Sequence, residues 1–209
     1  MNPFPSLYYI NLDYRIDRNS AMLEWIEDSG FPEHKVVRIS GVHVPGRGHL
    51  GCLLSHIKVV EEFLKTSDQY AIVLEDDFIP LDTTTFLPTL QKVFDDKVSF
   101  DMIMLAYNVL KSEPLETVDY LHKVKSSLTS SGYILSREFA STLLTNFKEA
   151  VDLLLQEENA TKQKTKHYCL DQHWQKLMSC SRWYCFYPRL GRQTDSYSDI
   201  EGKIPSHTG

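Results

Sequence analysis

The chain alternates between short apolar runs and longer segments in which apolar residues recur every three or four positions. Runs of about four to six apolar residues that end in polar ones are typical of buried strands. A repeat of three and four positions predicts an amphipathic helix. The predicted strands are residues 7–12, 36–39, 71–74, 102–105, 132–135 and 183–187, and the predicted helices are residues 18–29, 53–64, 137–147 and 170–178.

Three segments lack both patterns: glycine-rich residues 41–51, polar residues 156–166 and the tail from 189 to 209. We expect loops there. Strands that alternate with helices predict one α/β domain over residues 1–209, with a mostly parallel sheet flanked by helices. Ligands bind such sheets beyond the carboxyl ends of the strands. The polar residues that close the predicted strands are therefore site candidates: Asn11, Asp13, Glu75, Asp76, Asp77, Tyr107 and Asn108.

Composition narrows the function classes. The 209 residues carry 22 Lys and Arg against 28 Asp and Glu, a net charge of −6, which argues against a nucleic-acid partner. No apolar run approaches the ~20 residues that span a bilayer, and the start of the chain lacks the pattern of a signal peptide. The four cysteines form no CxxC pair, so we expect reduced thiols in a cytoplasmic protein.

The consecutive acids Glu75, Asp76 and Asp77 follow a buried strand and are the strongest local signal. Three adjacent carboxylates repel one another, and a hard divalent cation such as Mg²⁺ or Mn²⁺ relieves that repulsion and can hold phosphate oxygens. The alternative is an acidic turn that faces water. Neither GxxxxGK[ST] nor GxGxxG occurs, which disfavours the P-loop and Rossmann modes of nucleotide binding.

Two further segments offer groups that suit a nucleotide. Asn11 and Asp13 can hydrogen-bond a base or ribose, and Arg15 suits a diphosphate; the alternative is an ordinary strand-to-helix turn. Gly51 opens a predicted helix whose free N–H groups suit phosphate or ribose, with Ser55 as a further donor; the alternative is a capped core helix.

Asp171 lies in the first turn of a predicted helix, where a carboxylate is favoured by the helix dipole without any further function. The functional interpretation is a general base. His173 and Trp174 beside it could contact a sugar ring, although Trp174 has the spacing of a core residue.

In order along the chain, these segments resemble glycosyltransferase family 25. The similarity covers roughly residues 7–201, and each piece alone is weak, whereas six pieces in the family's order are specific. The matching pieces are residues 10–13 with Arg15 and Arg18, then 51–56, 72–77 and 131–136, then Asp171, and last Gln193 with 198–201.

The resemblance implies a GT-A type fold, a nucleotide-sugar donor and inversion at the anomeric carbon, with residues 75–77 at the place of the family's DxD metal motif. We expect a metal-dependent transferase that moves a hexose or deoxyhexose from a UDP-sugar to a hydroxyl of a glycan or glycoprotein. The resemblance implies that the cation, Mn²⁺ or Mg²⁺, is held by Asp77 and, as in other GT-A enzymes, by a C-terminal histidine, here His207. We expect the donor to be bound by Asn11, Asp13, Arg15, Ser55, Glu75 and Asp76. Asp171 is the expected base.

The chain departs from the family in two ways. It is short, so an acceptor-binding portion is absent or lies in another domain of a larger protein, and its compact form is similar to a glycosyltransferase domain from a large algal DNA virus. It also lacks the export signals of the collagen enzymes, so we expect a cytoplasmic enzyme of a bacterium or a virus-infected host cell. Two rival functions remain: a metal-dependent nucleotidyltransferase, and an inactive module that binds sugar nucleotides or glycans.

Overall fold

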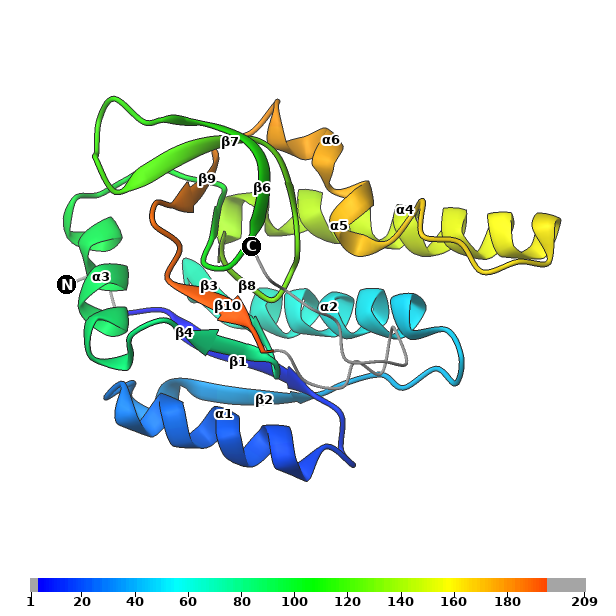
Figure 1. Cartoon of the computed structure of the whole chain (residues 1–209), viewed down its shortest axis with the longest axis horizontal. Coiled ribbons are helices and arrows are strands. Elements are labelled where there is room, and N and C mark those ends of the chain that lie inside the picture. The colour runs from blue at the N-terminus through cyan, green and yellow to red at the C-terminus, as the bar shows by residue number, and fades with distance from the viewer. Residues whose placement is uncertain (1–3, 195–209) are drawn as a thin grey trace.

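The computed structural model describes residues 4–194, apart from the side chains of residues 109 and 110. Within that part of the chain, eight strands form one sheet and two form a small second sheet (Figure 1). The strands are β1 (Ser6–Asn11), β2 (Val36–Ser40), β3 (Tyr70–Glu75), β4 (Phe78–Pro80), β5 (Met102–Met104), β6 (Asn108–Pro114), β7 (Leu121–Leu128), β8 (Gly132–Ser136), β9 (Trp183–Phe186) and β10 (Gly191–Gln193).

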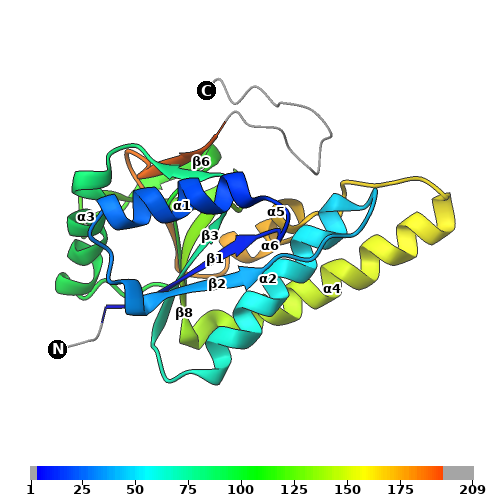
Figure 2. The ribbon, with the colours of Figure 1, turned by 90° about the horizontal axis from the view of Figure 1, so that it is seen from below.

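Helices cover both faces of the large sheet. Figure 2 shows α1 on one side of β1 and β2, with α2 and α4 on the other side. The helices are α1 (Ile16–Asp28), α2 (Gly48–Lys65), α3 (Thr83–Asp95), α4 (Arg137–Thr161), α5 (Leu170–His173) and α6 (Gln175–Met178), with a short 3₁₀ turn at Glu33–Lys35.

The strand order of the large sheet is β2-β1-β3-β8-β5-β9-β7-β6. β1 pairs in parallel with β2 and β3, and β5 pairs in parallel with β9. β8 is antiparallel to both β3 and β5, and β7 is antiparallel to β9 and β6. Six of these strands therefore point one way, and β8 and β7 point the other way, which confirms the predicted mostly parallel α/β sheet.

Alternate residues of β1 belong to two different cores. Leu7 and Tyr9 pack in the cluster with the buried side chains of α1 and α3. Tyr8 and Ile10 pack in the cluster with those of α2 and α4. A strand buried on both faces reads as a continuous apolar run, which is why the sequence reveals β1 and β3 so clearly.

Two boundaries of the predicted loops are wrong. α2 begins at Gly48, inside the first predicted loop, and α4 continues to Thr161, through the first residues of the second. Glu, Gln and Ala favour helix, and α4 packs along α2, so polar residues on its outer face do not end it. The helix ends at Lys162, whose φ is 58°.

The start of the tail is also ordered, because Gly191–Gln193 pairs with β4 as β10. At Gly191, a Cβ atom would lie 2.2 Å from the ring of Phe78, so only glycine permits this approach. The pairing brings the residues after β10 back to the acidic turn between β3 and β4, where the Thr194 N–H donates to the carbonyl oxygen of Asp77 at 2.8 Å.

Between residues 4 and 194, none of the helices combines the length and apolar character that a bilayer crossing requires. The four cysteines are unpaired in this structure.

Candidate active site

The carboxyl ends of β1, β2 and β3 meet at one edge of the sheet, because the three strands are parallel neighbours. β8 is antiparallel to β3 and therefore begins at the same edge, with Gly132 opposite Leu74. The Glu75 N–H donates to the carbonyl oxygen of Ser131 at 2.8 Å. The turn before β8, residues 129–131, thus becomes part of the edge where the acids lie.

A pocket of about 730 Å³, counting its open mouth, lies at this edge. That volume is within the usual range of small-molecule sites. Its walls come from β1, the acidic turn, the loop before α2 and the first turns of α2. Its lining includes Arg18, Val42, Gly51, Cys52, Ser55, His56 and the three acids Glu75, Asp76 and Asp77.

The loop before α2 is held against the helix by Ser55. Its hydroxyl donates to the carbonyl oxygen of Gly51 at 2.7 Å and accepts from the Val42 N–H at 2.8 Å. A Cβ atom on Gly51 would lie 2.4 Å from the Val42 carbonyl oxygen, so this close approach of the loop to α2 requires glycine at position 51. The Gly51 N–H bonds the Arg47 carbonyl at 3.1 Å, so the expectation of a free amide at Gly51 is wrong, because α2 starts one turn earlier.

Asn11 is buried and joins three parts of the site. Its amide nitrogen donates to an Asp76 carboxylate oxygen at 2.8 Å and to the Arg15 carbonyl at 3.0 Å. Its amide oxygen accepts from two nitrogens of Arg38, at 2.9 and 3.1 Å. The predicted contact of Asn11 with a base stays a prediction, and in this structure the side chain ties β1 to the acidic turn.

Asp76 is held from two sides. Besides Asn11, it accepts from Arg18 Nη1 at 2.7 Å. Burial raises the pKa of Asp76 above its ordinary value, and the charge and hydrogen bonds of Arg18 offset only part of that effect. The same Arg18 nitrogen lies 3.5 Å from Asp77 Oδ2, so one guanidinium serves both acids.

Asp13 and Arg15 lie at the edge of the site and have partners on the protein. Asp13 is exposed and accepts from Arg38 at 2.7 Å and Ser40 at 2.9 Å, and these bonds lower the pKa of its carboxyl. Arg15 makes a two-pronged contact with Asp17, at 2.8 and 3.0 Å. Arg15 lines a second hollow on the α1 side of Asp76.

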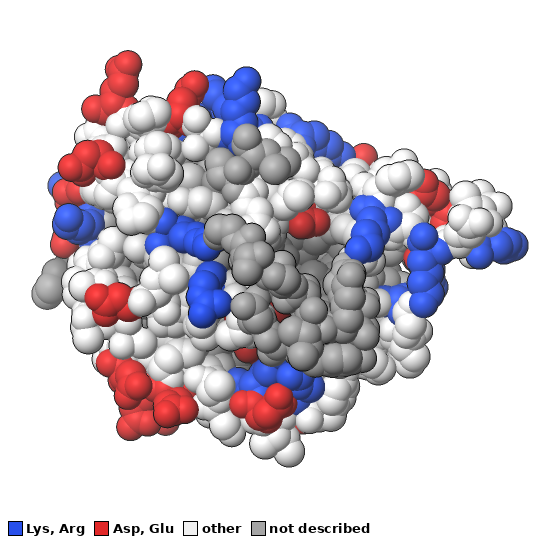
Figure 3. All heavy atoms as spheres, in the orientation of Figure 1, with Lys and Arg blue, Asp and Glu red and all other residues white. Residues whose placement is uncertain are grey.

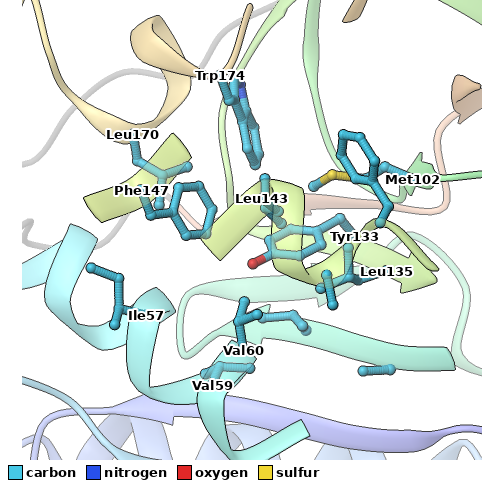
Figure 4. Packing of buried hydrophobic residues seen from close by; sticks show 14 of the residues in the cluster. Ile57, Val59, Val60, Met102, Tyr133, Leu135, Leu143, Phe147, Leu170 and Trp174 are labelled. Atoms are coloured by element: carbon cyan, nitrogen blue, oxygen red, sulfur yellow. The ribbon is translucent and has the colours of Figure 1, made fainter. Parts of the chain in front are cut away.

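Glu75 belongs to a buried hydrogen-bond network. Its Oε1 lies 3.2 Å from His56 Nε2 and accepts from the Ser130 hydroxyl at 2.5 Å. His56 Nδ1 is 2.8 Å from the hydroxyl of Tyr133, whose ring lies among the buried apolar side chains labelled in Figure 4. The hydrogen-bonding groups of Tyr133, His56, Ser130 and Glu75 are all satisfied when the Tyr133 hydroxyl donates to His56 Nδ1 and the His56 Nε2–H donates to Glu75. Burial alone would raise the pKa of Glu75, but His56, Ser130 and Arg18 lower it below its ordinary value.

Asp77 has the opposite environment. Within the described part of the chain, its Oδ1 is buried and has no hydrogen-bond partner. Burial, and then the charges of Glu75 and Asp76, raise the pKa of Asp77 to about 7, although Arg18 and Gln193 act in the other direction. A buried carboxylate oxygen without a partner is costly unless a cation or proton occupies it.

A second set of metal-ligating atoms, from Cys52, His56 and Glu75, lies within 4.8 Å of one another. Burial and the nearby acids raise the pKa of Cys52 well above its ordinary value, which disfavours the thiolate that binds metals. Both ring nitrogens of His56 already have partners. A hard cation therefore fits the oxygen of Asp77 better than this cluster.

Asp171 approaches the acids from α5. Its Oδ2 accepts from the Thr129 N–H at 3.1 Å, and the Thr129 hydroxyl accepts from the Asn108 amide at 3.1 Å. Burial raises the pKa of Asp171 despite the Thr129 bond, and the charge of Glu75 raises it further. Thr129 has a φ of +81°, which is strained for a β-branched residue and occurs where a site demands it.

Two other candidates are placed away from the acids, and one lies outside the described residues. Trp174 is fully buried and meets Trp183 with ring centroids 5.1 Å apart, so the suggested sugar contact is wrong and its core spacing is confirmed. His173 bonds Glu149 at 3.2 Å, away from the acids. His207 and residues 198–201 lie outside the described part of the chain.

The sequence does not identify three site residues, Arg38, Thr129 and Ser130. Nothing in their local sequence marks them, because each reaches the site through pairing with a distant segment. The signal that could have found them is position: Arg38 lies on the strand next to β1, and Thr129 and Ser130 directly precede β8.

Comparison with known proteins agrees with this architecture. The model of glycosyltransferase family 25, described as an LPS biosynthesis protein, matches residues 45–161, more than half of the chain. A relative from Anopheles gambiae, described as a "Glycosyltransferase 25 family member", is 28% identical over 170 residues. The match covers 66% of this chain but 28% of the relative, so the chain spans little more than a quarter of that protein.

Two solved structures share the fold at low identity. One is a glycosyltransferase involved in the glycosylation of the major capsid of PBCV-1, with a TM-score of 0.50 and 11% identity, covering 96% of this chain and 97% of that one. The other is described as a mannose-1-phosphate geranyltransferase from Thermus thermophilus, with a TM-score of 0.51 and 12% identity, covering 91% and 74%. The fold is of the GT-A type. The match of the family model over more than half of the sequence shows that this chain belongs to glycosyltransferase family 25.

Proposed function

We propose that this glycosyltransferase uses a divalent cation, Mn²⁺ or Mg²⁺, to transfer a hexose or deoxyhexose from a UDP-sugar to a glycan hydroxyl, with inversion at the anomeric carbon. The observation that carries the proposal is the buried Oδ1 of Asp77, which has no partner within residues 4–194 and borders the pocket at the strand ends.

The oxygen atoms of the acidic turn are ligands that suit a hard cation. Asp77 would hold the ion, and Asp76 lies beside it but is bound by Asn11 and Arg18. When bound, the ion neutralises charge that develops on the leaving diphosphate. Arg18, already beside both acids, adds a fixed positive charge to the same place.

The pocket also suits the rest of a nucleotide. Its other end is formed by Ile10, Leu12 and the loop residues Val42 and Val44, which offer an apolar slot for a base. Ser55 supports this slot from behind, because its hydroxyl is engaged with Val42 and Gly51. We therefore assign Ser55 to shaping the donor pocket.

Asp171 is our candidate for the base that inversion requires on the side opposite the leaving group. The Thr129 N–H orients its carboxylate, and its raised pKa makes it a stronger proton acceptor than an ordinary aspartate. Asp171 takes the proton of the acceptor hydroxyl as the hydroxyl oxygen attacks the anomeric carbon and the bond to the diphosphate breaks.

Product analysis tests the proposal. A panel of UDP-sugars is incubated with the chain and MnCl₂, MgCl₂ or EDTA, with and without a mixture of oligosaccharides, and UDP and pyrophosphate are quantified. We expect metal-dependent release of UDP. In a parallel incubation with UTP and hexose 1-phosphates, release of pyrophosphate would identify the rival nucleotidyltransferase. In the incubations with UDP-sugars, binding of UDP without turnover of any donor would identify an inactive binding module.

A further inference from the structure

Another concave surface lies beside residues 186–190, which lead into β10. It is enclosed by the loop before α3, the first half of α3 and residues 186–190, with an empty volume of about 760 Å³ including its mouth. We call it the tyrosine groove, and the lining residues that matter here are Leu81, Thr85, Thr89, Tyr120, Tyr187 and Arg189.

Large apolar side chains are exposed in this groove. Tyr187 and Leu81 are 55% and 54% exposed, and both line it. The Tyr187 ring stacks on His122 with centroids 4.0 Å apart and planes 15° apart, so the ring is supported on one face. Exposed apolar groups that gather in a concavity mark a binding surface.

The groove shares the lining residue Arg189 with a hollow beside the candidate active site. Arg189 also lines a smaller hollow, together with Tyr107, Asn108, Thr129, Arg192 and Gln193. Two residues of that hollow lead to the acids: the Thr129 N–H donates to Asp171, and Gln193 directly precedes Thr194, whose N–H donates to the carbonyl oxygen of Asp77. A ligand in the groove that extends across Arg189 is therefore directed toward the two acids to which we assign the reaction.

We propose that the tyrosine groove binds the acceptor glycan, with a sugar ring on the exposed face of Tyr187 and the glycan end directed across Arg189 toward Asp171. This inference rests on the proposed function and adds to it the place where the acceptor glycan binds.

The chemistry of the groove favours a sugar over the surface of a protein partner. A pyranose presents an apolar C–H face, which suits an aromatic ring, and a rim of hydroxyls, which suit Thr85, Thr89 and Arg189. A stable protein interface buries roughly 800 Å² of surface on each partner. A concavity of this size suits a smaller ligand, such as a few linked sugar rings. On the face drawn in Figure 3, basic side chains occur in small groups separated by acidic and uncharged ones, so a polyanionic acceptor is not favoured.

The test uses an array of immobilised oligosaccharides, probed with the whole chain in the presence of UDP and MnCl₂. The variants are Tyr187→Ala, Tyr187→Phe and Tyr14→Ala. Tyr14 is the matched control because it is 52% exposed and also contacts a histidine ring, His43, but on the donor side. We expect Tyr187→Ala to lower binding at least about tenfold, and Tyr187→Phe and Tyr14→Ala to stay within about twofold of wild type.

The proposal is overturned if the wild type binds no oligosaccharide on the array, or if Tyr187→Ala binds as the wild type does. UDP affinity, measured by calorimetry for every variant, separates this result from the proposed donor site. A wild type that fails to bind UDP contradicts the proposed function, whereas loss of glycan binding in Tyr187→Ala with UDP affinity intact supports the groove specifically.

Discussion

Glu75 and Asp77 lie two residues apart at the end of β3, yet the two sides of the acidic turn are built differently. On the side of α2, Glu75 accepts from His56 and Ser130, and its pKa is lowered despite burial. On the side of β10, an oxygen of Asp77 has no partner among the described residues, and its pKa is raised to about 7. A carboxylate that the protein satisfies stabilises the fold, whereas one that it leaves unsatisfied is available to a ligand.

The first consequence concerns turnover. Asp77→Asn should lower metal-dependent release of UDP by about 10³-fold, equivalent to ~4 kcal/mol of transition-state stabilisation, because the amide cannot replace a carboxylate at the cation. The melting temperature at pH 8 should not fall. UDP release and thermal melting are measured on this variant and on the control Asp28→Asn, an exposed acid in α1. Turnover within tenfold of wild type would remove Asp77 from the metal site.

The second prediction concerns Asp171. Asp171→Asn should lower sugar transfer by about 10²–10⁴-fold, because the amide cannot take a proton but can still accept from the Thr129 N–H. UDP affinity should change less than about twofold. Calorimetry with UDP and a transfer assay check both parts, and transfer within tenfold of wild type means that another residue is the base.

The third prediction concerns the stability of the fold and the other side of the turn, at Glu75. Glu75→Ala should destabilise the fold by about 2–4 kcal/mol, because it leaves the buried His56 and Ser130 groups without their acceptor. Glu75→Gln, which keeps an acceptor oxygen, should cost less. Urea unfolding of both variants and of Asp77→Ala measures the difference, and equal stability of Glu75→Ala and Asp77→Ala would contradict the contrast between the two sides.

The fourth prediction uses pH. Since the pKa of Asp77 is raised from 3.8 to about 7 in the folded chain, the native state binds more protons than the unfolded state between these values. The contribution of Asp77 to stability therefore falls as pH rises through this window. In EDTA, Asp77→Asn should gain ~2–3 kcal/mol relative to wild type between pH 5 and pH 8. A stability difference that does not change with pH would show that Asp77 is not protonated in the native state.

The smallest effect is expected at Ser55. Ser55→Ala removes the two hydrogen bonds that hold the loop before α2 and should cost ~1 kcal/mol of stability. Because the loop forms one wall of the pocket, the KM for the donor should rise several-fold with kcat nearly unchanged. A change in kcat alone would indicate that Ser55 acts on the reacting groups.

Local patterns predicted the parts of the fold that are buried on both faces. β1, β3 and β8 were found because their residues are apolar without interruption. β7 was not predicted, because its sequence Leu-His-Lys-Val-Lys-Ser-Ser-Leu exposes polar residues near the edge of the sheet. α3 was missed as well, since Pro88 lies inside it and threonines open it.

By itself, the sequence determined that acids close a buried strand, that Asn11 and Asp13 close its neighbour, and that parallel strands bring both to one edge. Only the tertiary structure decided which acid keeps an oxygen without a partner among the described residues. β8 inserts antiparallel beside β3 and brings Ser130 to Glu75 across 55 residues of sequence. β10 pairs with β4 and brings Gln193 to Asp77. A carboxylate's environment depends on the groups that long-range pairing places around it, and adjacent acids share the same local sequence but not the same neighbours.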